Sequence, residues 1–123
     1  MTRVAVTVLI VDDHPSFRRF ARGLLEAAGF LVVGDAEDGA SAVAAVEDLR
    51  PDVVLLDVLL PDATGFEVAK VLAAGPERPL VVLTSSRSAS DLGALVRTDH
   101  ARGYISKSDL TVAAFAALVG EAA

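Results

Sequence analysis

The stretch DVVLLDVLLPD, residues 52–62, does most to decide the fold. After Asp52, its apolar run from Val53 to Leu56 has no helical period and contains no polar position. A continuous apolar run of this length is typical of a strand that is buried on both faces of a parallel sheet. The run ends in a carboxylate, Asp57, which packing alone does not explain because burying a charge is costly.

Four further apolar runs resemble it. Val4–Val11 and Leu80–Leu83 are strong strand candidates, and the shorter runs 31–33 and 104–105 are weaker ones. They are rich in β-branched residues, which favour strands. The sequence therefore predicts five strands.

Helical patterns lie between these runs. From Pro15 onward, apolar residues recur at the spacing of one helix face, at Phe17, Phe20, Ala21, Leu24, Leu25 and Ala28. Arg18, Arg19 and Arg22 are expected on a solvated opposite face, and Gly29 is expected to end the helix. The other predicted helices cover residues 40–49 behind an Asp38 cap, 65–74 before Gly75-Pro76, 91–96, and a segment that begins near Ser108 or Asp109.

Strands that alternate with helices predict an α/β fold. Right-handed crossovers leave few topologies, and the doubly wound five-stranded parallel sheet of order 2-1-3-4-5, flanked by five helices, is a common one. No repeat, linker or low-complexity segment interrupts the chain. At 123 residues we therefore expect one domain over residues 1–123.

Composition excludes several classes of function. Lysine and arginine number 11 and aspartate and glutamate 17, so the net charge is −6, which disfavours direct binding of this domain to nucleic acid. Cysteine is absent, which excludes thiolate metal sites and cysteine nucleophiles. No apolar run approaches the ~18 residues of a membrane span, so we expect no membrane insertion and a cytoplasmic location.

The ends of the predicted strands carry the candidate chemistry. Asp12 and Asp13 follow the first strand, Asp57 the third, Thr84 the fourth and Lys107 the fifth. Ligands of open α/β sheets bind at this edge. Clustered carboxylates repel one another unless a cation intervenes, and Mg²⁺ prefers such oxygen ligands, with Mn²⁺ as a second candidate. An aspartate beside a metal, an ammonium and a hydroxyl could accept a phosphoryl group, with Asp57 as the nucleophile.

These motifs resemble the receiver domain of two-component response regulators, which has the chemotaxis-regulator-like fold. The resemblance rests on VLIVDDH (8–14), DVVLLDVLLPD (52–62), VVLTS (81–85) and GYISK (103–107). It covers essentially the whole chain, and the order and spacing of the motifs make it specific.

The resemblance implies a role for each residue. Asp57 would be the phosphoacceptor of a sensor histidine kinase or phosphotransfer protein. Asp13, Asp57 and the backbone carbonyl of Leu59 would bind Mg²⁺ directly, and Asp12 would bind it mainly through water. Three more residues would stabilise the phosphoryl group or switch conformation: Thr84, Lys107 and Tyr104. The surface formed by the fourth helix, fifth strand and fifth helix would then transmit the signal, and it is a candidate surface for a homodimer.

Two positions depart from the family pattern. Ser108 follows Lys107 where the family often has a cis-proline, and because a cis bond without proline costs ~2.5–4 kcal/mol we expect a trans bond. Leu59 stands beside the expected phosphoryl site, and we hypothesise that it restricts the attacking water. His14 and His100 are interpreted as surface residues without a chemical role.

Three other functions remain open. A phosphatase-type enzyme could also use an aspartyl phosphate, but such enzymes carry Asp-x-Asp after the first strand and a cap domain. A receiver-like binding module could act without phosphorylation. A flavodoxin-like nucleotide-binding protein would require a glycine-rich phosphate loop, which does not follow the first strand. We expect a signalling switch that catalyses only its own phosphorylation and dephosphorylation.

Overall fold

The computed structural model describes residues 5–86 and 99–120. Five parallel strands form one sheet in the order β2-β1-β3-β4-β5. The strands are β1 (Thr7–Val11), β2 (Leu31–Ala36), β3 (Val53–Asp57), β4 (Leu80–Ser85) and β5 (Gly103–Ser106). The helices are α1 (Pro15–Ala27), α2 (Gly39–Leu49), α3 (Gly65–Ala74) and α5 (Val112–Val119). The predicted fold class and strand order are confirmed; the predicted helix at 91–96 lies outside the described residues.

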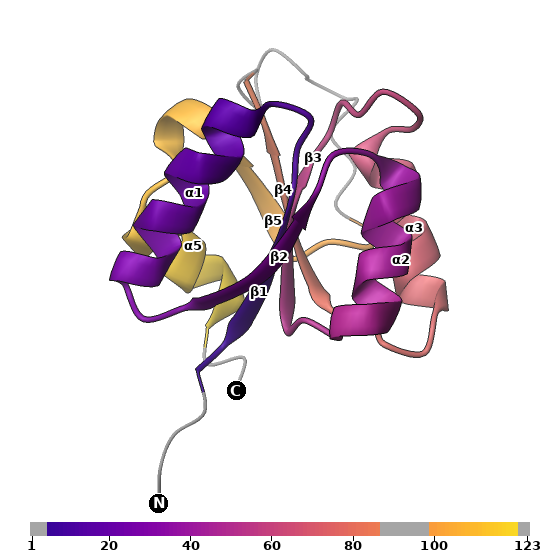
Figure 1. Ribbon diagram of the computed structural model, residues 1–123, viewed down its shortest axis with the longest axis horizontal. Coiled ribbons are helices and arrows are strands. Elements are labelled where there is room, and N and C mark those ends of the chain that lie inside the picture. Colours follow the sequence, from indigo (N-terminus) through magenta and orange to yellow (C-terminus); the bar gives the residue numbers. More distant parts are fainter. Residues whose placement is uncertain (1–4, 87–98, 121–123) are drawn as a thin grey trace, which may run out of the picture.

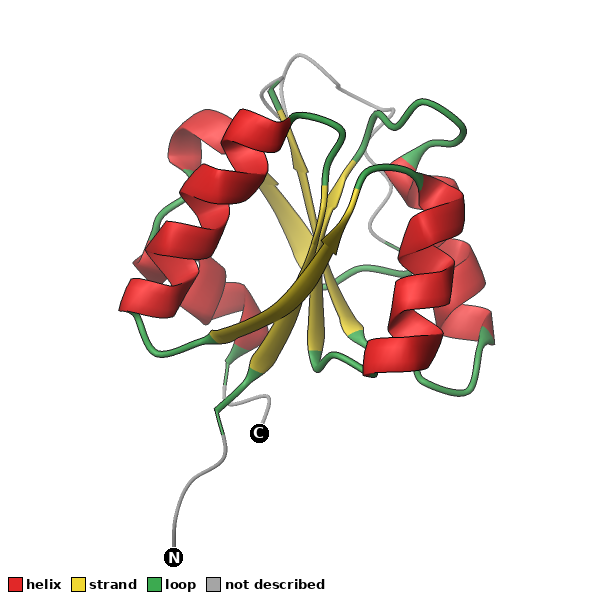
Figure 2. Ribbon diagram, viewed as in Figure 1, coloured by secondary structure: helices red, strands yellow, loops and turns green. Residues whose placement is uncertain are grey.

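The helices form one layer on each face of the sheet (Figure 1). α1 and α5 cover one face, and α2 and α3 cover the other. Figure 2 shows the strands running between these layers. Alternate side chains of each strand enter opposite cores: Val8 and Ile10 pack with the α1–α5 side, whereas Leu9 and Val11 pack with the α2–α3 side. This two-sided burial explains why the strand sequences are apolar without alternation.

Several element ends differ from the sequence prediction. β1 begins at Thr7 rather than Val4, because Thr7 is the first residue with a partner in β2, and its N–H is bonded to the Asp52 carboxylate. The weaker strand candidates extend to Ala36 and Ser106. These extensions follow from pairing with neighbouring strands, which single-strand propensity does not register.

Two helix expectations are corrected. α5 begins at Val112, not near Ser108, because a 3-10 turn occupies Lys107–Asp109 and the Thr111 hydroxyl caps α5 by accepting from the Ala114 N–H. Phe20 was predicted on the core face of α1 but is 54% exposed. Only the narrower stripe of Ala21 and Leu25 is buried against the sheet.

Other helix ends follow the prediction. Asp38 caps α2 in a reciprocal capping box with Ser41, and Gly29 takes a φ of 96° after α1. Among the helices that the structure describes, none is long and apolar enough to cross a membrane.

Candidate phosphoryl-acceptor site

The carboxyl ends of β1, β3, β4 and β5 lie at one edge of the sheet. Asp57, the last residue of β3, pairs in register with Thr84 of β4. Asp12 directly follows β1, and its N–H is bonded to the Ala36 carbonyl of β2. Lys107 directly follows β5. The parallel topology thus brings together side chains that are far apart in the sequence.

Lys107 links two of the carboxylates. Its Nζ lies 2.6 Å from Asp12 Oδ2 and 3.3 Å from Asp57 Oδ2. Asp12 is fully buried, Asp57 is 3% exposed, and the Lys107 side chain is 15% exposed. Two buried carboxylates therefore share one ammonium, which leaves excess negative charge at this edge.

Burial governs the acidity of Asp57. The pKa of the Asp57 carboxyl is raised from 3.8 to about 6, chiefly by burial and in smaller part by the neighbouring Asp12 charge. The Leu59 N–H, which donates to Asp57 Oδ1 at 3.1 Å, and the Lys107 ammonium oppose this rise in pKa. A further cation would favour the charged, nucleophilic form of Asp57.

The residues present fit a divalent cation. Asp12, Asp13, His14 and Asp57 each offer one ligand atom, and these atoms lie within 4.8 Å of one another. Three buried oxygens at this edge have no hydrogen-bond partner among the described residues: Asp12 Oδ2, Asp13 Oδ1 and Thr84 Oγ1. Among the described residues, Asp12 Oδ2 interacts with the Lys107 ammonium as an ion pair, but the geometry of this contact is not that of a hydrogen bond. Oxygen-rich, under-satisfied carboxylates are the ligands that Mg²⁺ and Mn²⁺ prefer.

The cluster opens into a hollow of about 290 Å³. Its lining residues include Asp13, His14, Asp57, Leu59, Ser86 and Lys107. Leu59 is 53% exposed and therefore stands at the solvent side of this hollow. The hollow thus gives a small group from solvent access to Asp57 and Lys107.

Hydrogen bonds hold the loop after β3 in place. The Gly65 N–H donates to the Val58 carbonyl at 2.6 Å, and a Cβ on Gly65 would overlap the carbonyl oxygen of Asp57. The Asp62 carboxylate accepts from the N–H groups of Gly39, at 2.7 Å, and Ala40, at 3.0 Å. These two bonds hold the pKa of Asp62 below its ordinary value and join the loop to the start of α2.

Thr84 and Tyr104 occupy different environments. Thr84 is fully buried, and its hydroxyl has no hydrogen-bond partner within residues 5–86 and 99–120. Tyr104 is half-buried and packs against the core on the α2–α3 side. The Lys107–Ser108 bond is trans, as predicted, because no cis bond occurs in the described chain.

The structure corrects the expectation for Arg18; it confirms that His14 is exposed and that Phe17 packs against the core, and it adds contacts for both. Arg18 is not on a solvated face: it is 17% exposed, and it donates to the Asp12 carbonyl at 2.5 Å and pairs with Asp35. His14 was given no chemical role, yet its Nδ1 contacts two carboxylates of the cluster. Phe17 was assigned only to the core, yet its ring lies 4.5 Å from Lys107 Nζ. Only the adjacency of His14 to Asp12-Asp13 signalled any of this in the sequence.

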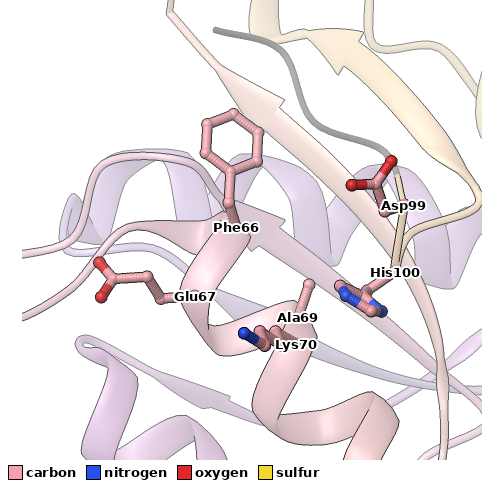
Figure 3. A pocket seen from close by; sticks show the side chains of 6 residues that line it. All are labelled: Phe66, Glu67, Ala69, Lys70, Asp99 and His100. Carbon is pink, nitrogen blue, oxygen red and sulfur yellow. The ribbon is translucent and has the colours of Figure 1, made fainter.

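A second hollow, of about 270 Å³, lies beside α3 (Figure 3). Phe66, Glu67, Ala69 and Lys70 line it from α3, and Asp99 and His100 from the turn before β5. Its charged side chains are of both signs, and the described residues form no metal-type cluster there. In the part of the chain that the structure describes, the acidic cluster with ligand spacing therefore lies at the sheet edge beside Asp57 and not in this hollow.

The doubly wound sheet and an aspartate–lysine cluster at its carboxyl edge define the class of receiver-like signalling domains. The family model described as response regulator receiver domain matches residues 8–114. The chain belongs to this family of two-component signalling domains.

Individual relatives agree. The chain is 41% identical over 87 residues to the DNA-binding response regulator MtrA of Mycolicibacterium smegmatis, which covers 69% of this chain and 37% of that protein. It is 37% identical over 84 residues to protein-glutamate methylesterase/protein-glutamine glutaminase 3 of Hahella chejuensis, covering 68% of this chain and 24% of that one. The chain thus spans well under two thirds of the length of these relatives.

Solved structures give the same fold. The CheY-like response regulator receiver domain of Methylobacillus flagellatus has a TM-score of 0.81 and 26% identity, covering 98% of this chain and all of that one. CheY4 of Vibrio cholerae, a chemotaxis response regulator, has a TM-score of 0.79 and 25% identity, covering 94% of this chain and 99% of that one.

Proposed function

We propose that the chain is a phosphoryl-accepting switch of a two-component system, with Asp57 as the acceptor. The observation that carries the proposal is the placement of Asp57 3.3 Å from the Lys107 ammonium and in register with Thr84, whose buried hydroxyl has no hydrogen-bond partner among the described residues. The donor would be a sensor histidine kinase or a phosphotransfer protein, as expected for the family.

Asp57 acts as the nucleophile in this proposal. A carboxylate oxygen attacks the phosphorus of a phosphohistidine, so that an O–P bond forms and the N–P bond breaks. The leaving imidazole nitrogen retains the electron pair and takes up a proton. Lys107 pairs with the transferred phosphoryl oxygens, and its existing contacts to Asp12 and Asp57 hold it in position.

Asp13, Asp57 and the Leu59 carbonyl would hold a Mg²⁺ ion, with Asp12 acting through water. When bound, Mg²⁺ supplies positive charge that offsets repulsion between the carboxylates and the phosphoryl oxygens. The hydroxyl of Thr84 is a buried hydrogen-bond donor that has no acceptor among the described residues. Donation by its hydroxyl to a phosphoryl oxygen would satisfy that donor only in the phosphorylated state, which would bias the fold between two conformations.

The domain would have no external substrate to turn over. The methylesterase name belongs to a relative of which this chain spans 24%, so it adds no esterase chemistry to these residues. Tyr104 on β5, together with α5, would contribute to the surface that changes on phosphorylation, and the same surface would be the place for a homodimer.

Incubation with acetyl phosphate and Mg²⁺, followed by intact-mass measurement, tests the proposal. We expect the mass of one phosphoryl group in the wild type and in Asp48→Asn, an exposed aspartate of α2, but none in Asp57→Asn. Circular dichroism checks that each variant is folded. No gain in the folded wild type, or a gain that persists in Asp57→Asn, would overturn the proposal.

A further inference from the structure

His14 is placed against the carboxylate cluster in a way that the proposed function does not use. Its Nδ1 lies 3.0 Å from Asp12 Oδ1 and 3.1 Å from Asp13 Oδ1. The backbone N–H of His14 also donates to Asp12 Oδ1, at 2.8 Å, which fixes the residue beside the cluster. Although His14 precedes α1 at the N-cap position, its side chain makes no capping hydrogen bond. The ring is therefore available for another role.

The separation of His14 Nδ1 from Asp13 is that of neighbouring ligands around one ion. In an octahedron with metal–ligand distances of about 2.1 Å, adjacent ligand atoms are about 3.0 Å apart. The separation of 3.1 Å from Nδ1 to Oδ1 of Asp13, a direct ligand in the proposed site, has this length. His14 belongs with Asp12, Asp13 and Asp57 to the one group whose ligand atoms all lie within 4.8 Å in the part of the chain that the structure describes.

We propose that His14 Nδ1 is a nitrogen ligand of the divalent-cation site, which therefore favours transition-series ions such as Mn²⁺ and Co²⁺ over Mg²⁺. The inference rests on the cation site of the proposed function. Mg²⁺ takes oxygen ligands and gains little from an imidazole, whereas affinity for nitrogen ligands rises along the series from Mn²⁺ to Co²⁺. One imidazole beside the Asp13 and Asp57 carboxylates thus changes selectivity without removing the Mg²⁺ ligands.

The exposure of the ring is consistent with this role. The His14 side chain is 64% exposed, so Nε2 can carry its proton in contact with water while Nδ1 presents a lone pair to the ion. The competing explanation is that Nδ1–H only donates hydrogen bonds to Asp12 and Asp13. A cation would then compete with the ring, and removing the ring would strengthen the binding of every divalent ion.

The chain offers a matched control, because its other histidine is His100. His100 precedes the amino end of β5, whereas His14 follows the carboxyl end of β1, so the two lie toward opposite ends of the parallel sheet. His100→Gln therefore removes an imidazole without touching the carboxylate cluster.

Pulsed electron paramagnetic resonance of bound Mn²⁺ tests the ligand directly. We expect ¹⁴N modulation from an imidazole in the wild type and in His100→Gln, and its loss in His14→Gln. Calorimetric titrations with Co²⁺ and Mg²⁺ test the selectivity. In His14→Gln we expect Co²⁺ affinity to fall about tenfold or more, with a change of less than about threefold for Mg²⁺.

Each other outcome has a distinct meaning. Bound Mn²⁺ without nitrogen modulation in the wild type, or equal losses for Co²⁺ and Mg²⁺ in His14→Gln, overturns the role of His14. Tighter binding of both ions in that variant identifies the ring as a hydrogen-bond donor instead. If the wild type binds no divalent ion and gains no phosphoryl group, the proposed function itself fails. If the wild type is phosphorylated with Mg²⁺ but gives one of the contrary results above, only the inference about His14 fails.

Discussion

Replacing Asp57 with asparagine should stabilise the fold at high pH in the absence of divalent cations. The pKa of Asp57 is about 6 in the folded protein against an ordinary 3.8. One pKa unit corresponds to roughly 1.4 kcal/mol, so ionisation of Asp57 above pH 6 costs about 3 kcal/mol of unfolding free energy. The asparagine variant avoids this cost but loses the attraction to Lys107, so we expect a net gain of about 1–3 kcal/mol at pH 8.

The raised pKa of Asp57 determines the pH range over which this residue changes the free energy of unfolding. A carboxyl group whose pKa is raised on folding contributes most stability below pH 3.8, and the contribution is lost as pH rises through about 6. The difference between Asp57→Asn and the wild type should therefore be small at pH 4 and grow up to about pH 7. Other carboxyl groups, such as Asp62 with its lowered pKa, change stability in both proteins alike and cancel in this difference.

Urea unfolding followed by far-ultraviolet circular dichroism, in EDTA, measures the effect. Added Mg²⁺ should stabilise the wild type more than Asp57→Asn, because it binds the folded carboxylate cluster. An equally stable or less stable variant at pH 8, or a difference that does not depend on pH, would refute the reasoning about burial.

Three further predictions concern the surroundings of Asp57. Leu59→Asn should lose the phosphoryl group faster than the wild type, because a polar side chain at this exposed position admits water; equal rates contradict the hypothesis. Gly65→Ala should reduce the unfolding free energy by about 1–3 kcal/mol because its Cβ would overlap backbone, whereas Gly23→Ala, with open space in α1, should raise it by about 0.5–1 kcal/mol. Phe17→Leu should slow phosphorylation by acetyl phosphate about two- to tenfold through the lost cation–π contact with Lys107, at unchanged stability to urea within about 1 kcal/mol; an unchanged rate would remove Phe17 from the site.

The sequence was sufficient for the sheet and for the carboxylate edge. Apolar runs such as 53–56 predict buried parallel strands, and parallel strands necessarily place Asp12, Asp57 and Lys107 at one edge. The positions of these residues at the ends of predicted strands were enough to predict the cluster, because the carboxyl ends of neighbouring parallel strands lie at the same edge of the sheet.

Side-chain direction at the edge could not be predicted in the same way. His14 and Arg18 turn toward the site because the chain bends between β1 and α1, and no periodic pattern records that bend. The exposed Phe20 shows the same limit for α1, whose apolar face is wider than the stripe that the sheet covers. Such details depend on packing between elements rather than on local propensity.

The acceptor itself can be located chemically. After reaction with acetyl phosphate and Mg²⁺, sodium borohydride reduces an aspartyl phosphate to homoserine, and tandem mass spectrometry of the peptides identifies the modified position. The account predicts homoserine at position 57 in the wild type. Homoserine at position 12 or 13 instead, or at no position in a folded sample, would contradict it.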